Sequence, residues 1–256
     1  MRPATPELSI VIPAFNEEKR LPRTLAAIFQ YLNEQSAGPD QVEIIVVDDG
    51  SKDGTIQSSE AMARDWPSLR VISNGQNRGK GFSVRHGMLE ARGRVSLFTD
   101  ADLSSPIEEW PKLRAALESG YDGAIGSRAI DRTLIATRQS RFRETAGIIF
   151  NGLVRLVTGL PFHDTQCGFK AFFTDRARIV FQNQRIEGFG FDPEILFLAK
   201  RFGLRVAEVP VRWAHDPATK VRVLRDSLQM FGDLFYIRWN WLVGRYAKRP
   251  NERQSI

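Results

Sequence analysis

Two aspartates separated by one residue are the side chains in this sequence best suited to chemistry. Asp100 and Asp102 follow the apolar run 94–98, at the point where a predicted buried strand emerges into a loop. Side chains at i and i+2 of an extended segment point to the same side, so both carboxylates aim at one point. A divalent cation relieves their repulsion, and hard oxygen ligands suit Mg²⁺ or Mn²⁺. The alternative is a pair of solvated loop aspartates.

Two further polar clusters also follow predicted strands. Pro13-Ala14-Phe15-Asn16-Glu17 comes after the strand 8–13, and Asp48-Asp49-Gly50-Ser51 ends the strand 42–48. Open parallel α/β sheets bind ligands at the carboxyl ends of their strands. We therefore expect one crevice that binds a nucleotide diphosphate, with carboxylates available to ribose hydroxyls or a base N–H and the metal at the phosphates.

The segment Gly79-Lys80-Gly81 opens a predicted helix. Backbone N–H groups at a helix start bind phosphate, which is one interpretation of this segment. The other is an ordinary loop with a solvated lysine. No Gly-x-Gly-x-x-Gly follows the first strand and no Walker loop is present, which disfavours a dehydrogenase and a P-loop nucleotidase.

Short apolar strands alternate with helices of 10–15 residues in the first half of the chain, which predicts an α/β domain with a mainly parallel sheet. The expected strands are 8–13, 42–48, 69–72, 95–99 and 121–127, and the expected helices are 16–33, one ending near 65, 77–91 and 106–118. Beyond Arg128 we expect a mobile loop at 130–141, helices at 142–158, 192–202 and 224–246, and strands at 168–173 and 205–211.

The composition fits a peripheral membrane protein as well as a basic soluble one. The 256 residues carry a net charge of +6 and a single cysteine, Cys167, so no intramolecular disulfide forms. No window reaches the roughly 18–20 uninterrupted apolar residues of a membrane span. A basic chain favours nucleic acid, anionic lipid or a phosphorylated substrate, and simple solubility is the alternative.

The three clusters together resemble the GT-A fold glycosyltransferases of family 2, in both order and spacing, over the first 130 residues or so. Asp164-Thr165-Gln166-Cys167-Gly168-Phe169-Lys170 and Phe191-Asp192-Pro193-Glu194 narrow the resemblance to polyprenyl-phosphate glycosyltransferases, closest to the dolichyl-phosphate β-glucosyltransferase branch. The resemblance implies a GT-A fold and an inverting hexosyltransferase. Such an enzyme moves a sugar, glucose from UDP-glucose in the favoured case, onto a polyprenyl phosphate with a β linkage. GDP-mannose or another nucleotide sugar is the alternative donor, and a polysaccharide or protein the alternative acceptor.

The resemblance also assigns roles to residues of this chain. The implied catalytic residues are Asp102, Asp100 and Arg128, the two aspartates being the ligands of Mg²⁺ or Mn²⁺. The expected nucleotide-binding residues are Pro13, Ala14, Phe15, Glu17, Asp48, Asp49, Lys80, Asp100 and Ala101. The basic residues expected at the acceptor phosphate are Arg128, Arg141 and Lys220, each of which has a surface charge as its alternative. Asp192 and Glu194 either shape the sugar pocket or cap a helix. Mannose synthases often place a glutamine where this chain has Ser104, so the third protein ligand of the metal stays open.

We expect a catalytic domain at 1–220 and an amphipathic membrane-associating helix with a basic tail at 221–256. Aromatic residues such as Trp239 and basic residues such as Arg238 share the predicted tail helix, which fits either core packing or a membrane interface. The favoured location is peripheral, on the cytoplasmic face of a membrane, and the oligomeric state stays open. A nucleic-acid-binding module is a third hypothesis, disfavoured because the carboxylate clusters repel phosphate without a metal.

Overall fold

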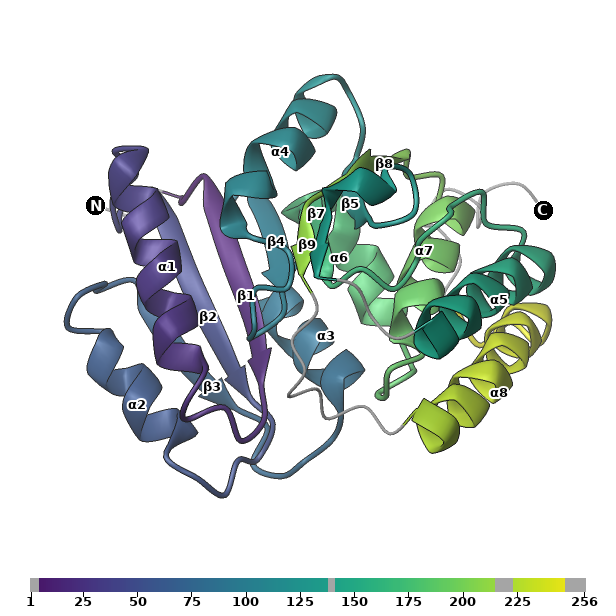
Figure 1. The fold of residues 1–256 in the computed structure, drawn as a ribbon, viewed down its shortest axis with the longest axis horizontal. Helices are drawn as coiled ribbons and strands as arrows, with labels where there is room; N and C mark the ends of the chain where they lie inside the picture. The colour runs from purple at the N-terminus through teal and green to yellow at the C-terminus, as the bar shows by residue number, and fades with distance from the viewer. Residues whose placement is uncertain (1–4, 138–140, 215–222, 247–256) are drawn as a thin grey trace.

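A seven-stranded mixed sheet forms the centre of the molecule (Figure 1). The computed structural model describes residues 5–137, 141–214 and 223–246. The strands lie in the order β3-β2-β1-β4-β7-β5-β8, and every neighbouring pair is parallel except those that β7 makes. Their bounds are β1 Leu8–Ala14, β2 Val42–Asp48, β3 Leu69–Ser73, β4 Val95–Thr99, β5 Gly123–Ser127, β7 Phe169–Phe173 and β8 Val206–Pro210.

Helices cover both faces of the sheet (Figure 1). The described helices are α1 Leu21–Glu34, α2 Thr55–Met62, α3 Lys80–Glu90, α4 Trp110–Glu118, α5 Arg141–Thr158, α6 Thr174–Asn183, α7 Phe191–Arg201 and α8 Val223–Leu242, with 3₁₀ turns at Ile107–Glu109 and Arg132–Leu134. A short parallel pair joins β6, Ile135–Thr137, to β9, Trp213–Ala214. The α/β class with a mainly parallel sheet is therefore confirmed.

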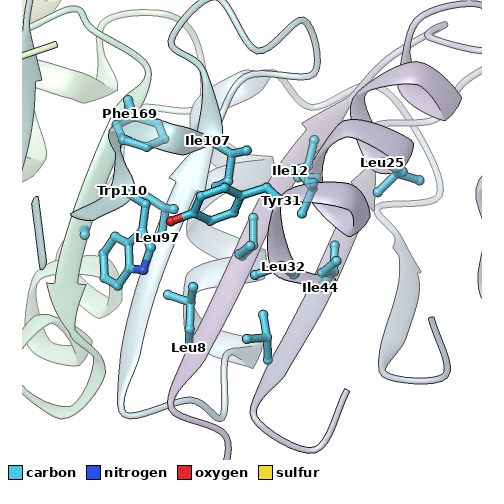
Figure 2. Close-up of a cluster of buried hydrophobic side chains, with 14 of the residues drawn as sticks. Leu8, Ile12, Leu25, Tyr31, Leu32, Ile44, Leu97, Ile107, Trp110 and Phe169 are labelled. Atoms are coloured by element: carbon cyan, nitrogen blue, oxygen red, sulfur yellow. The ribbon is translucent and has the colours of Figure 1, made fainter. Parts of the chain in front are cut away.

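Alternation along the strands builds two hydrophobic cores. Ile10 and Ile12 of β1 face one core, which also holds residues of α1 and α4 (Figure 2). Val11, between them, faces the second core, with residues of α3, α6 and α7. Because successive side chains of a strand point to opposite faces, a run of apolar residues in β1 serves both cores at once. The parallel pairing of β1 with β2 and β4 brings the carboxyl ends of these strands to one edge of the sheet.

The antiparallel strand β7 brings a distant loop to that same edge. Thr99, the last residue of β4, pairs with Phe169, the first residue of β7. The loop that precedes β7 therefore lies beside the carboxyl end of β4 and against β5, which β7 also pairs with. Gly168 shows how close the approach is, since an added Cβ there would overlap the carboxylate of Asp100.

Several elements differ from the sequence prediction. Helix α1 begins at Leu21 and not near residue 16, because Asn16 has a left-handed backbone with φ +54° and bonds the β2–α2 turn instead. Helix α6 was not predicted, although Ala177, Val180 and Phe181 are buried at helical spacing. The expected loop 130–141 contains a 3₁₀ turn and β6.

Candidate active site

A cleft of about 520 Å³ opens at the carboxyl ends of the parallel strands. Its lining draws on the segments after β1, β2 and β4, on the start of α3 and on the loop before α7. The lining residues are Pro13, Ala14, Phe15, Glu17, Arg20, Asp49, Asn77, Gly79, Lys80, Ser83, Asp100, Ala101, Asp102, Gly188 and Phe189. The three polar clusters of the sequence thus meet in one crevice, and every expected nucleotide-binding residue except Asp48 lines it.

The carboxylate pair at the end of β4 already attracts a cation of the protein. Lys80, the first residue of α3, places its Nζ 2.5 Å from Oδ1 of Asp100. Burial alone would lower the pKa of Lys80, but the carboxylates of Asp100, Asp192 and Asp102 outweigh it and raise that pKa. Burial, followed by the Asp100 charge, raises the pKa of Asp102. The site therefore carries an excess of negative charge that a cation stabilises.

These two carboxylates fit a divalent cation. Both groups are hard oxygen ligands of the kind that Mg²⁺ and Mn²⁺ take. Among the described residues, no group of three or more His, Cys, Asp or Glu side chains is gathered in a way that would hold a metal ion. Ser104 donates its backbone N–H to Oδ1 of Asp102 at 2.9 Å. Nucleotide phosphates and water would have to complete the coordination.

The two aspartates at the carboxyl end of β2, Asp48 and Asp49, have different roles. Asp48 is buried and does not line the cleft: its carboxylate accepts the backbone N–H groups of Gly50 and Ser51 and so shapes the turn after β2. Asp49 lines the cleft, and its Oδ2 accepts the N–H of Gly79 at 2.8 Å. The carboxylate of Asp49 thus occupies a donor at the start of α3 that the phosphate-binding interpretation would require.

The glycines on either side of Lys80 serve close packing. Gly79 has φ +108°, and an added Cβ would collide with the carbonyl oxygen of Glu187. A Cβ at Gly81 would lie 2.6 Å from the carbonyl oxygen of Ile186. The loop that carries Gly188 into the cleft therefore rests directly on the start of α3, and only glycine permits that approach.

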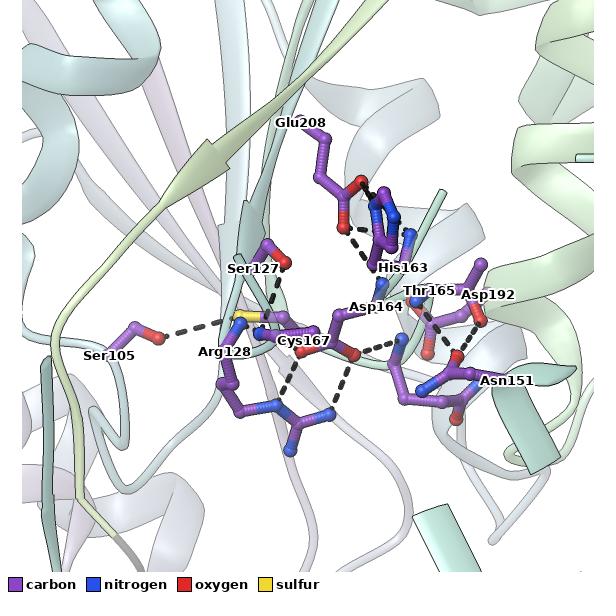
Figure 3. Close-up of polar contacts among 12 residues, drawn as sticks. Ser105, Ser127, Arg128, Asn151, His163, Asp164, Thr165, Cys167, Asp192 and Glu208 are labelled. Atoms are coloured by element: carbon purple, nitrogen blue, oxygen red, sulfur yellow. Dashed lines mark hydrogen bonds and ion pairs between the residues drawn. The ribbon is translucent and has the colours of Figure 1, made fainter. Parts of the chain in front are cut away.

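Arg128, directly after β5, forms a bidentate ion pair with Asp164 (Figure 3). Its Nε and Nη2 lie 2.6 and 2.8 Å from the two carboxylate oxygens. Burial opposes both charges, but the pairing raises the pKa of Arg128, with a smaller contribution from Asp100, and lowers the pKa of Asp164 to about 2. Glu208 of β8 accepts the N–H of Asp164 at 2.8 Å and so fixes the loop from the far side.

Two acidic residues of α7 lie behind the cleft, and neither lines it. Asp192 is buried and pairs with Lys170 of β7, whose Nζ lies 2.5 Å from Oδ1. Glu194 is fully buried and accepts the backbone N–H groups of Arg185 and Ile186. Glu194 therefore holds the 185–188 loop over the start of α3.

Lys170 is a buried charge to which the sequence reasoning gave no role. It is completely buried, donates to the carbonyl oxygen of Cys167 at 2.6 Å and lies over the ring of Phe98. The sequence does contain a sign of this role: Lys170 stands inside the apolar strand Phe169–Phe173. A buried ammonium there requires an acidic partner. That partner, Asp192, is the same residue whose charge acts on Lys80.

The remaining residues are two that were expected at the acceptor phosphate and the single cysteine. Arg141 is the first residue of α5, and Lys220 lies outside the described residues. Cys167 is buried, and burial, followed by the Asp164 charge, raises the pKa of its thiol to about 11. That environment agrees with a packed thiol and opposes a nucleophilic one.

The fold matches solved GT-A glycosyltransferases. Glucosyl-3-phosphoglycerate synthase from Mycobacterium tuberculosis in complex with UDP superposes with a TM-score of 0.66 at 21% identity, covering 91% of this chain and 80% of that one. The same enzyme with Mn²⁺, UDP and glucosyl-3-phosphoglycerate gives a TM-score of 0.64 at 20% identity, covering 92% and 79%. At this identity the likeness establishes the fold, and the expected GT-A class is confirmed.

Sequence comparison then gives the family. The model described as glycosyl transferase family 2 matches residues 9–178, so the chain belongs to that family and is a glycosyltransferase. The dolichyl-phosphate β-glucosyltransferase of Drosophila melanogaster is 42% identical over 251 residues, covering 94% of this chain and 77% of that protein. The human protein of the same name is 36% identical over 262 residues, covering 98% and 81%. The resemblance inferred from the motifs is confirmed.

Proposed function

We propose that the protein transfers glucose from UDP-glucose to a polyprenyl phosphate and forms a β-linked lipid-phosphate sugar. The observation that carries this proposal is the similarity, over nearly the whole chain, to enzymes named dolichyl-phosphate β-glucosyltransferases. The geometry supports it, because the carboxylates that line the cleft and the guanidinium of Arg128, which does not line it, follow parallel strands of one sheet.

On the donor side, Asp100 and Asp102 would hold Mg²⁺ or Mn²⁺. When bound there, the cation supplies charge neutralisation for the departing diphosphate. Lys80 lies against Asp100 and is a cationic side chain placed to contact a phosphate oxygen in the same cleft. Pro13, Ala14 and Phe15 line the cleft beside it and offer the wall against which the nucleoside packs.

On the acceptor side, Arg128 binds and orients the incoming phosphate. The polyprenyl phosphate is already anionic at neutral pH, so its attack requires no strong general base. What the enzyme must supply is a cation that brings a second anion close to the diphosphate. Asp164 holds two guanidinium nitrogens of Arg128, which fixes the direction of that cation. Arg141, at the start of α5, and Lys220 are the further candidates for this phosphate.

We propose that Asp192, which does not line the cleft, acts through its charge on Lys80. It is buried against Lys170, so its proposed role is to attract and orient the ammonium of Lys80. Glu194 acts indirectly. It holds the backbone of Ile186, in the loop that carries Gly188 and Phe189 into the cleft.

A lipid acceptor requires a membrane-facing surface, and α8 offers one. Its outward stripe is exposed and apolar, with Leu228, Phe231, Phe235, Trp239 and Leu242 at helical spacing. Exposed Ile148, Ile149 and Leu156 continue the apolar surface on α5, which lies beside α8 (Figure 1). None of the helices within the described residues is long and apolar enough to cross a bilayer. We propose peripheral docking through 221–256 and α5, at the cytoplasmic face, with 1–220 as the catalytic domain.

The experiment is a transfer assay with a panel of donors. Purified protein is incubated with Mg²⁺ or Mn²⁺, polyprenyl phosphate and radiolabelled UDP-glucose, UDP-galactose or GDP-mannose, and lipid-extractable label is counted. The proposal predicts label from UDP-glucose, and more of it than from the other donors. Preference for GDP-mannose would correct the sugar, and label on soluble glycans alone would overturn the lipid acceptor.

A further inference from the structure

A second cavity, of about 450 Å³, lies where α5, α7 and α8 meet. It is lined by Leu156, Val157, Thr158, Gly159, Lys200, Arg201 and Arg238. It shares no lining residue with the donor cleft, so it is a separate feature of the surface. Three of its seven lining residues are cationic, and none of the described residues that line it is acidic.

Two of these cations are held in place by neighbouring groups. Lys200 donates to the carbonyl oxygen of Gly159 at 2.6 Å, at the end of α5. The guanidinium of Arg201 lies 5.1 Å from the ring centre of Phe197 and 5.0 Å from that of Trp241. Stacking on aromatic rings orders an arginine while leaving its N–H groups free to donate outward.

The usual structural role of basic residues accounts for only part of the cluster. Lys200 and Arg201 occupy the last turn of α7, where positive charge offsets the helix dipole. Arg238 lies inside α8, which has no basic residue in its last turn, so that reason does not extend to it. A third cation directed to the same cavity without a lining carboxylate indicates an anionic ligand.

The apolar neighbours indicate where that anion comes from. Leu156 lines the cavity and is 80% exposed, and Trp239 and Leu242 follow Arg238 along α8 with exposures of 58% and 72%. Arginine beside exposed tryptophan and leucine is the combination that settles at the headgroup level of a bilayer, with the apolar groups below the phosphates.

We propose that this cavity binds the phosphate of an anionic membrane phospholipid headgroup. The inference rests on the proposed membrane docking and adds the lipid class to it. Each basic side chain at an anionic surface contributes about 1 kcal/mol, so removal of one cation predicts a loss of about fivefold in vesicle affinity.

The test compares binding to vesicles of phosphatidylcholine alone with binding to vesicles that also contain phosphatidylglycerol, both without polyprenyl phosphate. Wild type should bind the mixed vesicles more tightly. Arg238→Gln should lose about fivefold on the mixed vesicles and little on phosphatidylcholine. The matched control is Arg64→Gln, an exposed arginine just beyond α2 that removes the same charge from a different part of the molecule.

The outcomes separate this inference from the one it rests on. Equal losses in the two variants mean that general electrostatics accounts for binding, and they overturn the headgroup site. Wild-type binding that gains nothing from phosphatidylglycerol overturns it as well, while leaving the membrane docking supported. A wild type that binds neither vesicle overturns both.

Discussion

The ammonium of Lys80 lies 2.5 Å from Oδ1 of Asp100, at the carboxylate pair that we propose as the metal ligands. A metal ion that binds Asp100 would compete with this ammonium for the carboxylate, and we propose that Lys80 then turns toward the rest of the cleft. One side chain thus stabilises the carboxylates before the donor arrives and becomes available to the phosphates afterwards.

Lys80→Met is expected to tighten Mn²⁺ binding in the absence of nucleotide and to weaken binding of UDP in its presence. The expected gain for the metal is about fivefold, because a partly exposed ion pair contributes up to about 1 kcal/mol. Titration of Mn²⁺, followed by electron paramagnetic resonance, measures the first effect, and calorimetry with UDP measures the second. Lys112→Met, which removes a lysine on α4 outside the cleft, is the control. Unchanged Mn²⁺ affinity in Lys80→Met would contradict the proposed competition between the metal and the Lys80 ammonium for Asp100.

Gly168→Ala is expected to weaken Mn²⁺ and UDP binding by about tenfold or more. The added Cβ would overlap the Asp100 carboxylate, and overpacking of this kind costs about 1–3 kcal/mol, which displacement of Asp100 would relieve. Gly147→Ala is the matched control, because its Cβ meets nothing within 4 Å and alanine favours the exposed helix α5. Calorimetric titration of both variants decides the matter, and equal affinities would contradict the proposed role of Asp100.

The polar clusters were predictable because each follows its own strand. The termination of β1, β2 and β4 is a local property of the chain, and parallel strands deliver their carboxyl ends to one edge. The partners of these clusters were not predictable in the same way. Arg128 meets Asp164 only because β7 runs antiparallel beside β5, and no local pattern carries that order.

Other differences arise where contacts in the folded chain override a local sequence pattern or where no such pattern exists. The acidic residues at 17–18 suggested a helix start, yet Asn16 takes a left-handed backbone and Glu17 accepts the side chain of Arg20 before α1 begins. The roles of Glu194 and Asp48 depend on the backbone N–H groups that donate to them. The positions of those groups cannot be inferred from residue spacing in the sequence.

Stability is expected to fall as the pH rises from about 4.5 to 7, in part because of Glu194. Burial raises the pKa of Glu194 to about 7, against the lowering effect of bonds from Ile186 and Tyr246. A carboxyl whose folded pKa is raised stabilises the fold when protonated, so its contribution is complete below the unfolded pKa and is lost through the folded one. Urea unfolding at pH 5 and pH 7.5 measures the slope. Glu194→Gln should reduce the slope, and an identical slope would show that Glu194 does not titrate in this window.

Trp239→Ser is expected to weaken binding to phosphatidylcholine vesicles by about tenfold, because the burial of a large apolar side chain contributes about 1.5–3 kcal/mol. Trp239 is 58% exposed on the apolar stripe of α8, so its removal leaves the folded core intact. Tyr121→Ser removes an aromatic side chain that is 40% exposed outside this stripe and should have no effect. Vesicle sedimentation compares the two, and equal binding would place the membrane contact elsewhere.

The carboxylate pair of β4 is the centre of the proposed chemistry, and Asp102→Asn tests it most directly. The measurement is the initial rate of glucose transfer from UDP-glucose to polyprenyl phosphate at saturating metal. The metal that Asp102 would hold neutralises the leaving diphosphate, so loss of this carboxylate predicts a fall of about 100-fold or more. Asp65→Asn, an exposed aspartate outside the cleft, should keep the wild-type rate. A wild-type rate in Asp102→Asn would contradict the assignment.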